Sequence, residues 1–86
     1  MKIFRKKAKN LGYEIIKEDE DKVVLERGKT KGDHCVMELY RNGSVYFYYE
    51  ELKKNGYAPY KKRIPWELQE PEIDLINQFR KEFLKL

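Results

Sequence analysis

The dipeptide Asn42-Gly43 stands between two short segments of alternating apolar and polar residues, and it constrains the fold more than any other feature. Residues 34–40 and 44–49 follow a period of two, which is typical of β-strands. Asn-Gly between two such segments is the strongest short-range signal for a hairpin turn. We therefore predict an antiparallel hairpin here.

The register of this hairpin decides which side chains share a face. A two-residue turn would pair Glu38 with Phe47 and place a carboxylate opposite a phenylalanine. A three-residue loop, with Gly43 in a left-handed bulge position, would instead pair Leu39 with Val45. Burying an inner face that lacks the Glu38 carboxylate is more favourable by several kcal/mol than burying one that contains it, at about 25 cal/mol per Å² of apolar area. We therefore predict the three-residue loop. The inner face then comprises Cys35, Met37, Leu39, Val45, Phe47 and Tyr49.

The residues before this hairpin have patterns typical of a helix followed by another hairpin. Apolar residues at helical spacing followed by a glycine predict a helix over residues 2–11. Strands at 13–17 and 23–27 flank an acidic turn at 18–21. An odd-length loop is expected there, because it places one apolar set on the inner face. The helix stripe comprises Ile3, Phe4, Ala8 and Leu11, and the strand set comprises Tyr13, Ile15, Val23 and Leu25.

The segment after the central hairpin is less regular. Residues 50–57 predict a turn of helix, and residues 57–66 predict an extended irregular loop because Pro59 and Pro65 remove backbone donors. Pro71 suits the first turn of a final helix. The apolar stripe of that helix comprises Ile73, Ile76, Phe79, Phe83 and Leu86.

These elements predict an α+β domain. Its architecture is a four-stranded antiparallel β-meander packed against an N-terminal and a C-terminal helix, in the order α-β-β-β-β-α and in two layers. A chain of 86 residues has room for one core, so we expect a single domain over residues 1–86.

The composition indicates the cellular compartment and argues against a membrane-spanning protein. Cys35 is the single cysteine, so no intramolecular disulfide can form, which fits a reducing cytosol. No window approaches the roughly 18 consecutive apolar residues needed to cross a bilayer. No apolar stretch follows the basic N-terminal residues, so no signal peptide is predicted. We expect a cytoplasmic protein without a membrane partner.

Charge is unevenly distributed along the chain. Residues 1–12 and 53–63 each hold five basic and no acidic residues, and the remaining chain holds nine basic and fifteen acidic residues. Such segregation favours a polyanionic partner for one face. The alternative interpretation is a solvated surface, since 40% of the residues are charged.

Catalytic and metal chemistry find no support in the residue pattern. His34 and Cys35 are adjacent in a predicted strand, so their side chains leave opposite faces. One histidine and one cysteine do not make a zinc site. Residues 28–32 do not match a phosphate loop, and residues 18–21 lack the spacing of a calcium loop. We predict no catalytic residues, no metal, no cofactor and no small-molecule substrate.

The outer face of the predicted sheet carries an unusual number of tyrosines. Tyrosine presents a flat apolar ring with a polar rim, which suits base stacking and protein interfaces alike. The neighbouring loop interleaves rings with cations, although it could instead fold across the outer face and cover the tyrosines. The predicted binding residues are Tyr40, Tyr46, Tyr48, Lys53, Lys54, Tyr57, Tyr60, Lys61, Lys62, Arg63 and Trp66.

These features predict a small non-enzymatic binding module, and two partner classes stay open. In the first, nucleic acid binds, with lysines 53, 54, 61 and 62 and Arg63 contacting phosphates and Tyr46, Tyr48 and Tyr60 stacking on bases. In the second, the same rings form a protein interface or a homodimer.

Overall fold

The computed structural model describes residues 2–30, 33–55, 58–65 and 67–84. Side chains are described except those of 2, 29–30, 33–34, 51–55 and 58–62. In chain order the described elements are α1 (Lys2–Asn10), β1 (Glu14–Glu18), β2 (Lys22–Thr30), β3 (Asp33–Tyr40), β4 (Val45–Asn55), β5 (Ala58–Pro65), α2 (Glu70–Phe79) and the π-helical turn η1 (Arg80–Leu84).

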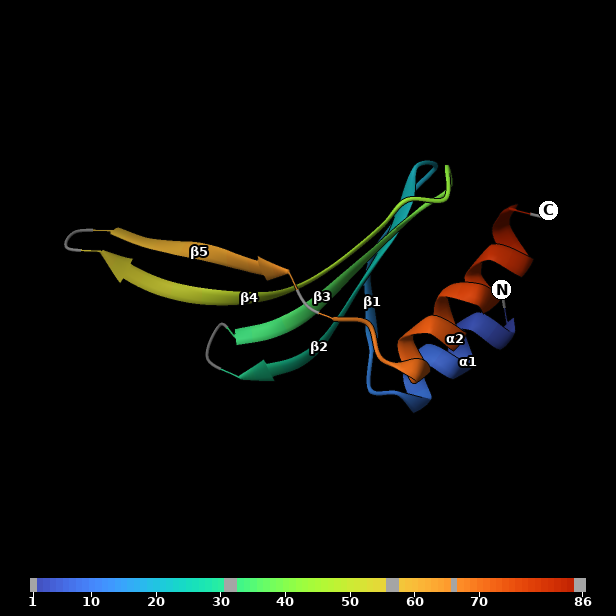
Figure 1. Cartoon of the computed structure of the whole chain (residues 1–86), viewed down its shortest axis with the longest axis horizontal. Helices are drawn as coiled ribbons and strands as arrows, with labels where there is room; N and C mark the ends of the chain where they lie inside the picture. Colours follow the sequence, from blue (N-terminus) through green and yellow to red (C-terminus); the bar gives the residue numbers. More distant parts are fainter. Residues whose placement is uncertain (1, 31–32, 56–57, 66, 85–86) are drawn as a thin grey trace.

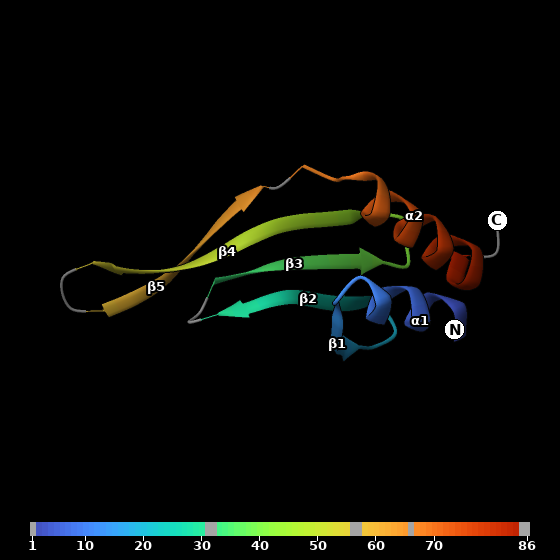
Figure 2. The ribbon, with the colours of Figure 1, turned by 90° about the horizontal axis from the view of Figure 1, so that it is seen from below.

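The predicted class is confirmed: the fold is α+β, with an antiparallel sheet and helices at both ends of the described chain. The sheet is a meander in the order β1-β2-β3-β4-β5. In Figures 1 and 2, α1 and α2 lie side by side at one end of the molecule, near both termini. The prediction of four strands is wrong, because five are present within the described residues.

The core lies between the inner face of the sheet and the helices, as amphipathic elements require. Among the described helix residues it takes Phe4 and Ala8 from α1 and Leu75, Ile76 and Phe79 from α2. Its fully buried strand residues are Val23, Leu25, Met37 and Leu39, with Phe47 at 8% exposure. None of the described helices is long and apolar enough to cross a membrane.

The register predicted for the central hairpin is confirmed. Leu39 pairs with Val45 and Met37 with Phe47. The amide N–H of Tyr40 donates to the carbonyl of Ser44 at 2.9 Å, and Gly43 has a φ of 97°. The loop therefore has the predicted three residues, and Phe47 faces the core.

In the first hairpin the predicted residues share the inner face, but the loop has a different length from the one predicted. Ile15 pairs with Leu25, so the expected inner set forms. The loop itself is even in length, because Glu18 pairs with Val23 and the amide of Asp19 donates to the carbonyl of Lys22 at 3.0 Å. The prediction of an odd-length loop is therefore wrong. A β-bulge between Ile15 and Lys17 adds one residue to β1, and this extra residue places the apolar side chains on the inner face.

The helical turn predicted over 50–57 and the irregular loop predicted over 57–66 are also wrong. β4 continues to Asn55, and β5 pairs with it from Tyr48↔Pro65 to Asn55↔Ala58. Because β5 lies at the edge of the sheet, Pro59 and Pro65 are tolerated there: an edge strand need not donate on its open side.

Two apolar residues assigned to the helix stripes are exposed. Ile3 is 56% and Ile73 45% exposed. In α2 the buried face instead runs through Glu72, Leu75, Ile76 and Phe79, which follow the i, i+3, i+4, i+7 spacing of one helical face. The predicted stripe residue Leu86 lies outside the described residues.

The far end of β4 and β5 leaves the body of the sheet. The pairing of β3 with β4 ends at His34↔Glu50, and beyond it residues 51–55 and 58–62 pair only with each other among the described strands. We call these two segments the arm. Figures 1 and 2 both show it reaching past the ends of β2 and β3, and the molecule measures 48 × 24 × 21 Å.

Candidate binding face

The outer face of the sheet, opposite the helices, contains an open groove of about 390 Å³. Alternate residues of paired strands share a face, so the register brings side chains from β3, β4 and β5 together there. The groove is lined by Glu38, Tyr40, Tyr46, Tyr48, Arg63 and Pro65, together with Phe47, whose side chain faces the core. Its volume falls within the range of small ligand sites.

Glu38 lies at the centre of a hydrogen-bond cluster on this face. The hydroxyl of Tyr48 donates to Glu38 Oε2 at 2.6 Å, and the hydroxyl of Tyr40 donates to Oε1 at 2.9 Å. The ammonium of Lys22 donates to the same Oε1 and to the Tyr40 hydroxyl, both at 3.3 Å. Three donors therefore hold a carboxylate whose side chain is 13% exposed.

Burial and hydrogen bonding act on the pKa of Glu38 in opposite directions. Burial raises that pKa, but the hydrogen bonds from Tyr48, Tyr40 and Lys22 together outweigh it and hold the pKa below its ordinary value. Burial, together with the hydrogen bond to Glu38, raises the pKa of Tyr48. The cluster therefore combines an ionised carboxylate with a neutral phenol at neutral pH.

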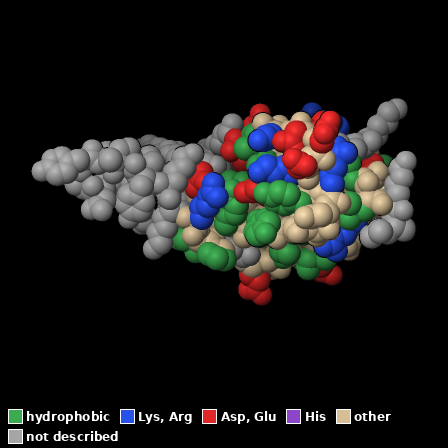
Figure 3. Space-filling model, turned by 90° about the horizontal axis from the view of Figure 1, so that it is seen from above, with side chains coloured by type: hydrophobic (Ala, Val, Ile, Leu, Met, Phe, Trp, Pro, Cys, Tyr) green, Lys and Arg blue, Asp and Glu red, His purple; other side chains and the backbone are tan. Residues whose placement is uncertain are grey.

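The rings on this face are arranged with cations beside them. Tyr40 and Tyr46 meet edge to face, with centroids 5.5 Å apart and planes at 81°. Lys22 Nζ lies 5.2 Å from the centroid of Tyr40, and the Arg63 guanidinium lies 4.9 Å from that of Tyr48. Figure 3 shows hydrophobic side chains gathered near the middle of the described surface, with charged side chains among them.

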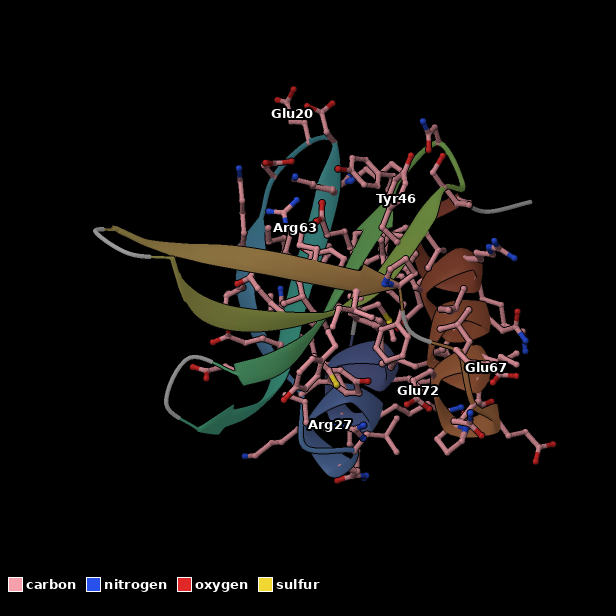
Figure 4. The ribbon with its side chains drawn as sticks, turned by 60° about the vertical axis from the view of Figure 1, so that its left-hand side comes forward. Glu20, Arg27, Tyr46, Arg63, Glu67 and Glu72 are labelled. Carbon is pink, nitrogen blue, oxygen red and sulfur yellow. The ribbon has the colours of Figure 1, made fainter. Side chains whose placement is uncertain are left out.

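Arg63 enters the groove from β5. Its Nε lies 3.4 Å from Oε2 of Glu50, whose side chain is 7% exposed, while the Arg63 side chain is 65% exposed. Figure 4 shows Arg63 and Tyr46 over the sheet, away from the helices. The buried carboxylate therefore anchors an arginine that still faces solvent.

The structure brings together four of the predicted binding residues, namely Tyr40, Tyr46, Tyr48 and Arg63. For Lys53, Lys54, Tyr60, Lys61 and Lys62 only the backbone is described, and β4 and β5 pair Lys53 with Tyr60 and Lys54 with Pro59. Tyr57 and Trp66 lie outside the described residues.

Sequence reasoning missed the roles of Lys22 and Pro65 and the central position of Glu38. Lys22 pairs with Tyr40 across β2 and β3, so the register of those strands was the signal that could have found it. Tyr46 is 57% exposed, and β5 pairs alongside β4. The described part of the predicted loop therefore leaves Tyr46 uncovered.

Two of the N-terminal basic residues lie beside acidic side chains. Arg5 Nη2 lies 2.7 Å from Oε2 of Glu18, and Lys7 Nζ lies 2.9 Å from Oδ2 of Asp74. Acidic neighbours thus offset part of the positive charge of α1, which reduces its attraction for a polyanion.

A second polar cluster lies on the inner side of the sheet. The Arg27 guanidinium stacks 4.9 Å from the centroid of the buried Tyr13 ring, and its Nη2 lies 3.7 Å from Oε1 of Glu72. Figure 4 shows Arg27 and Glu72 together beside the helices. Elsewhere too, the described side chains form no group of three potential metal ligands.

Comparison with protein-family models, with curated proteins and with solved structures finds no match.

Proposed function

We propose that this chain is a small non-enzymatic module that binds nucleic acid through the outer face and the arm. The observation that carries the proposal is the antiparallel pairing of β4 with β5. It brings two basic runs of the sequence, Lys53-Lys54 and Lys61-Lys62-Arg63, onto neighbouring strands. These strands continue directly into the tyrosine face.

The electrostatics of the outer groove are compatible with a polyanion. The carboxylates of Glu38 and Glu50 are largely buried and are paired with Lys22 and Arg63. Each negative charge is thereby offset locally. A lysine-rich strand pair beside the exposed ring of Tyr46 is a combination that can neutralise phosphates and stack on a base.

The test is the salt dependence of oligonucleotide binding, measured by fluorescence anisotropy between 20 and 200 mM salt. We expect affinity to fall steeply with salt, because cations released from the phosphates drive binding. Replacing Lys61 and Lys62 with alanine should lower the slope of log K against log salt by roughly one to two units.

The matched control removes the same charge from the other side of the molecule. Lys6 and Lys9 lie exposed on α1, and the variant Lys6→Ala/Lys9→Ala should retain most of the affinity. Equal losses in both double variants would mean that only net charge matters, and absence of binding at low salt would overturn the proposal.

A protein interface or a homodimer is the second candidate, and the extended surface favours it. The molecule exposes 6262 Å², against about 5,400 Å² for a compact monomer of its mass. Its radius of gyration is 13.9 Å, against about 12 Å for a compact chain. Sedimentation equilibrium distinguishes the candidates: a mass that doubles with concentration and returns to 10.5 kDa in Tyr46→Ala would favour the dimer.

A further inference from the structure

The described tyrosines of the outer groove fall into two kinds. The hydroxyls of Tyr40 and Tyr48 both donate hydrogen bonds to the carboxylate of Glu38. The hydroxyl of Tyr46 makes no hydrogen bond with the described residues, and the residue is 57% exposed. Its ring meets the Tyr40 ring edge to face, so Tyr40 supports the Tyr46 ring.

The Arg63 side chain is likewise fixed by its neighbours, although much of its guanidinium stays exposed to solvent. One side of its guanidinium faces the Tyr48 ring, and Nε approaches Glu50. Arginine carries five N–H donors in a planar fork, and with the side chain 65% exposed, donors on Nη1 and Nη2 can reach an incoming group. A stacked, oriented guanidinium is suited to binding phosphate.

We propose that the outer groove binds single-stranded nucleic acid, with one unpaired base stacked on Tyr46 and a neighbouring phosphate on Arg63. This inference rests on the proposed function and names its substrate class. In a duplex both faces of a base are covered by its neighbours, so a ring on a sheet face can stack only on a base that has left the stack.

Glu38 is a positioning residue in this arrangement. It fixes Tyr40 and Tyr48, and these two rings in turn support Tyr46 and Arg63. The groove of about 390 Å³ between them is open at the surface, so a base can enter without displacing the hydrogen-bonded cluster.

The experiment compares a fluorescein-labelled ten-nucleotide thymidine strand with the matching duplex, between 20 and 200 mM salt, for the wild type and four variants: Tyr46→Ala, Tyr46→Phe, Arg63→Ala and Lys61→Ala/Lys62→Ala. We expect the single strand to bind more tightly than the duplex. Tyr46→Ala should weaken single-strand binding roughly tenfold, whereas Tyr46→Phe, which keeps the ring, should bind like the wild type. Arg63→Ala should lower the salt slope by about one unit.

The outcomes separate this inference from the proposed function. Equal binding of duplex and single strand, with Tyr46→Ala unchanged and Lys61→Ala/Lys62→Ala weakened, would overturn the stacking site and leave nucleic-acid binding standing. A thermal unfolding curve for Tyr46→Ala that matches the wild type shows that lost binding is not lost folding. No binding to either probe overturns both proposals.

Discussion

At the scale of single residues, Glu38 determines how the outer face is built. Its carboxylate is enclosed, yet it stays ionised because the donors around it outweigh the effect of burial on its pKa. A buried charge that lost these partners would be strongly destabilising. The positions of Tyr40 and Tyr48 therefore depend on the charge of this one residue.

Replacing Glu38 with glutamine should destabilise the fold by about 2 kcal/mol at pH 7, because three charge-assisted hydrogen bonds are weakened. The folded-state pKa of Glu38 lies below the ordinary value of 4.5, so its ionisation stabilises the fold fully above that pH. This contribution is lost as the pH falls through the folded-state pKa. Urea unfolding from pH 7 to pH 3 should show the two proteins converging.

The control is Glu20→Gln at the exposed turn between β1 and β2, where Figure 4 shows the side chain pointing away from the sheet. It should leave the free energy of unfolding unchanged at every pH. A constant gap between Glu38→Gln and the wild type from pH 7 to pH 3 would contradict the assigned role of the charge.

At the scale of elements, the hairpin of β3 and β4 depends on the conformation of Gly43. Its φ of 97° lies in the region that L side chains avoid, while a Cβ added there would meet no atom within 4 Å. Gly43→Ala should therefore cost about 1 kcal/mol from backbone strain alone. Gly43→Asn should cost less, since asparagine enters this region more readily. Equal and negligible losses in urea unfolding would contradict the three-residue loop.

The same hairpin shows what could be predicted from the sequence. Its turn residues and its apolar alternation are local, so the two strands as far as Tyr49, their register and the shared face of Tyr40, Tyr46 and Tyr48 followed from them. The strand β5 could not be found this way, because Pro59 and Pro65 argue against a strand unless it lies at a sheet edge. Edge position is a property of the whole sheet. The contacts of Lys22 with Glu38 likewise depend on the register of β2 against β3, in which Lys22 pairs with Tyr40, 18 positions away in the chain.

At the scale of the whole molecule, the edges of the sheet limit how copies could associate. β1 is short, with five residues and a bulge, and β5 carries prolines and a run of basic residues. Both are devices that discourage pairing between exposed edges. We therefore propose that a partner contacts the outer face or the arm, and not an exposed sheet edge through strand pairing.

Removing the arm tests this division of the molecule into a folded body and a contact surface. Glu50 and Arg63 are directly paired, so an Asn-Gly turn can join them in place of residues 51–62. The described core draws on the helices and on strand residues up to Phe47, so the shortened chain should still unfold cooperatively. Loss of four lysines should reduce the salt slope for single strands by roughly three units. A shortened chain that folds and keeps the affinity and slope of the parent would show that the arm is no contact surface.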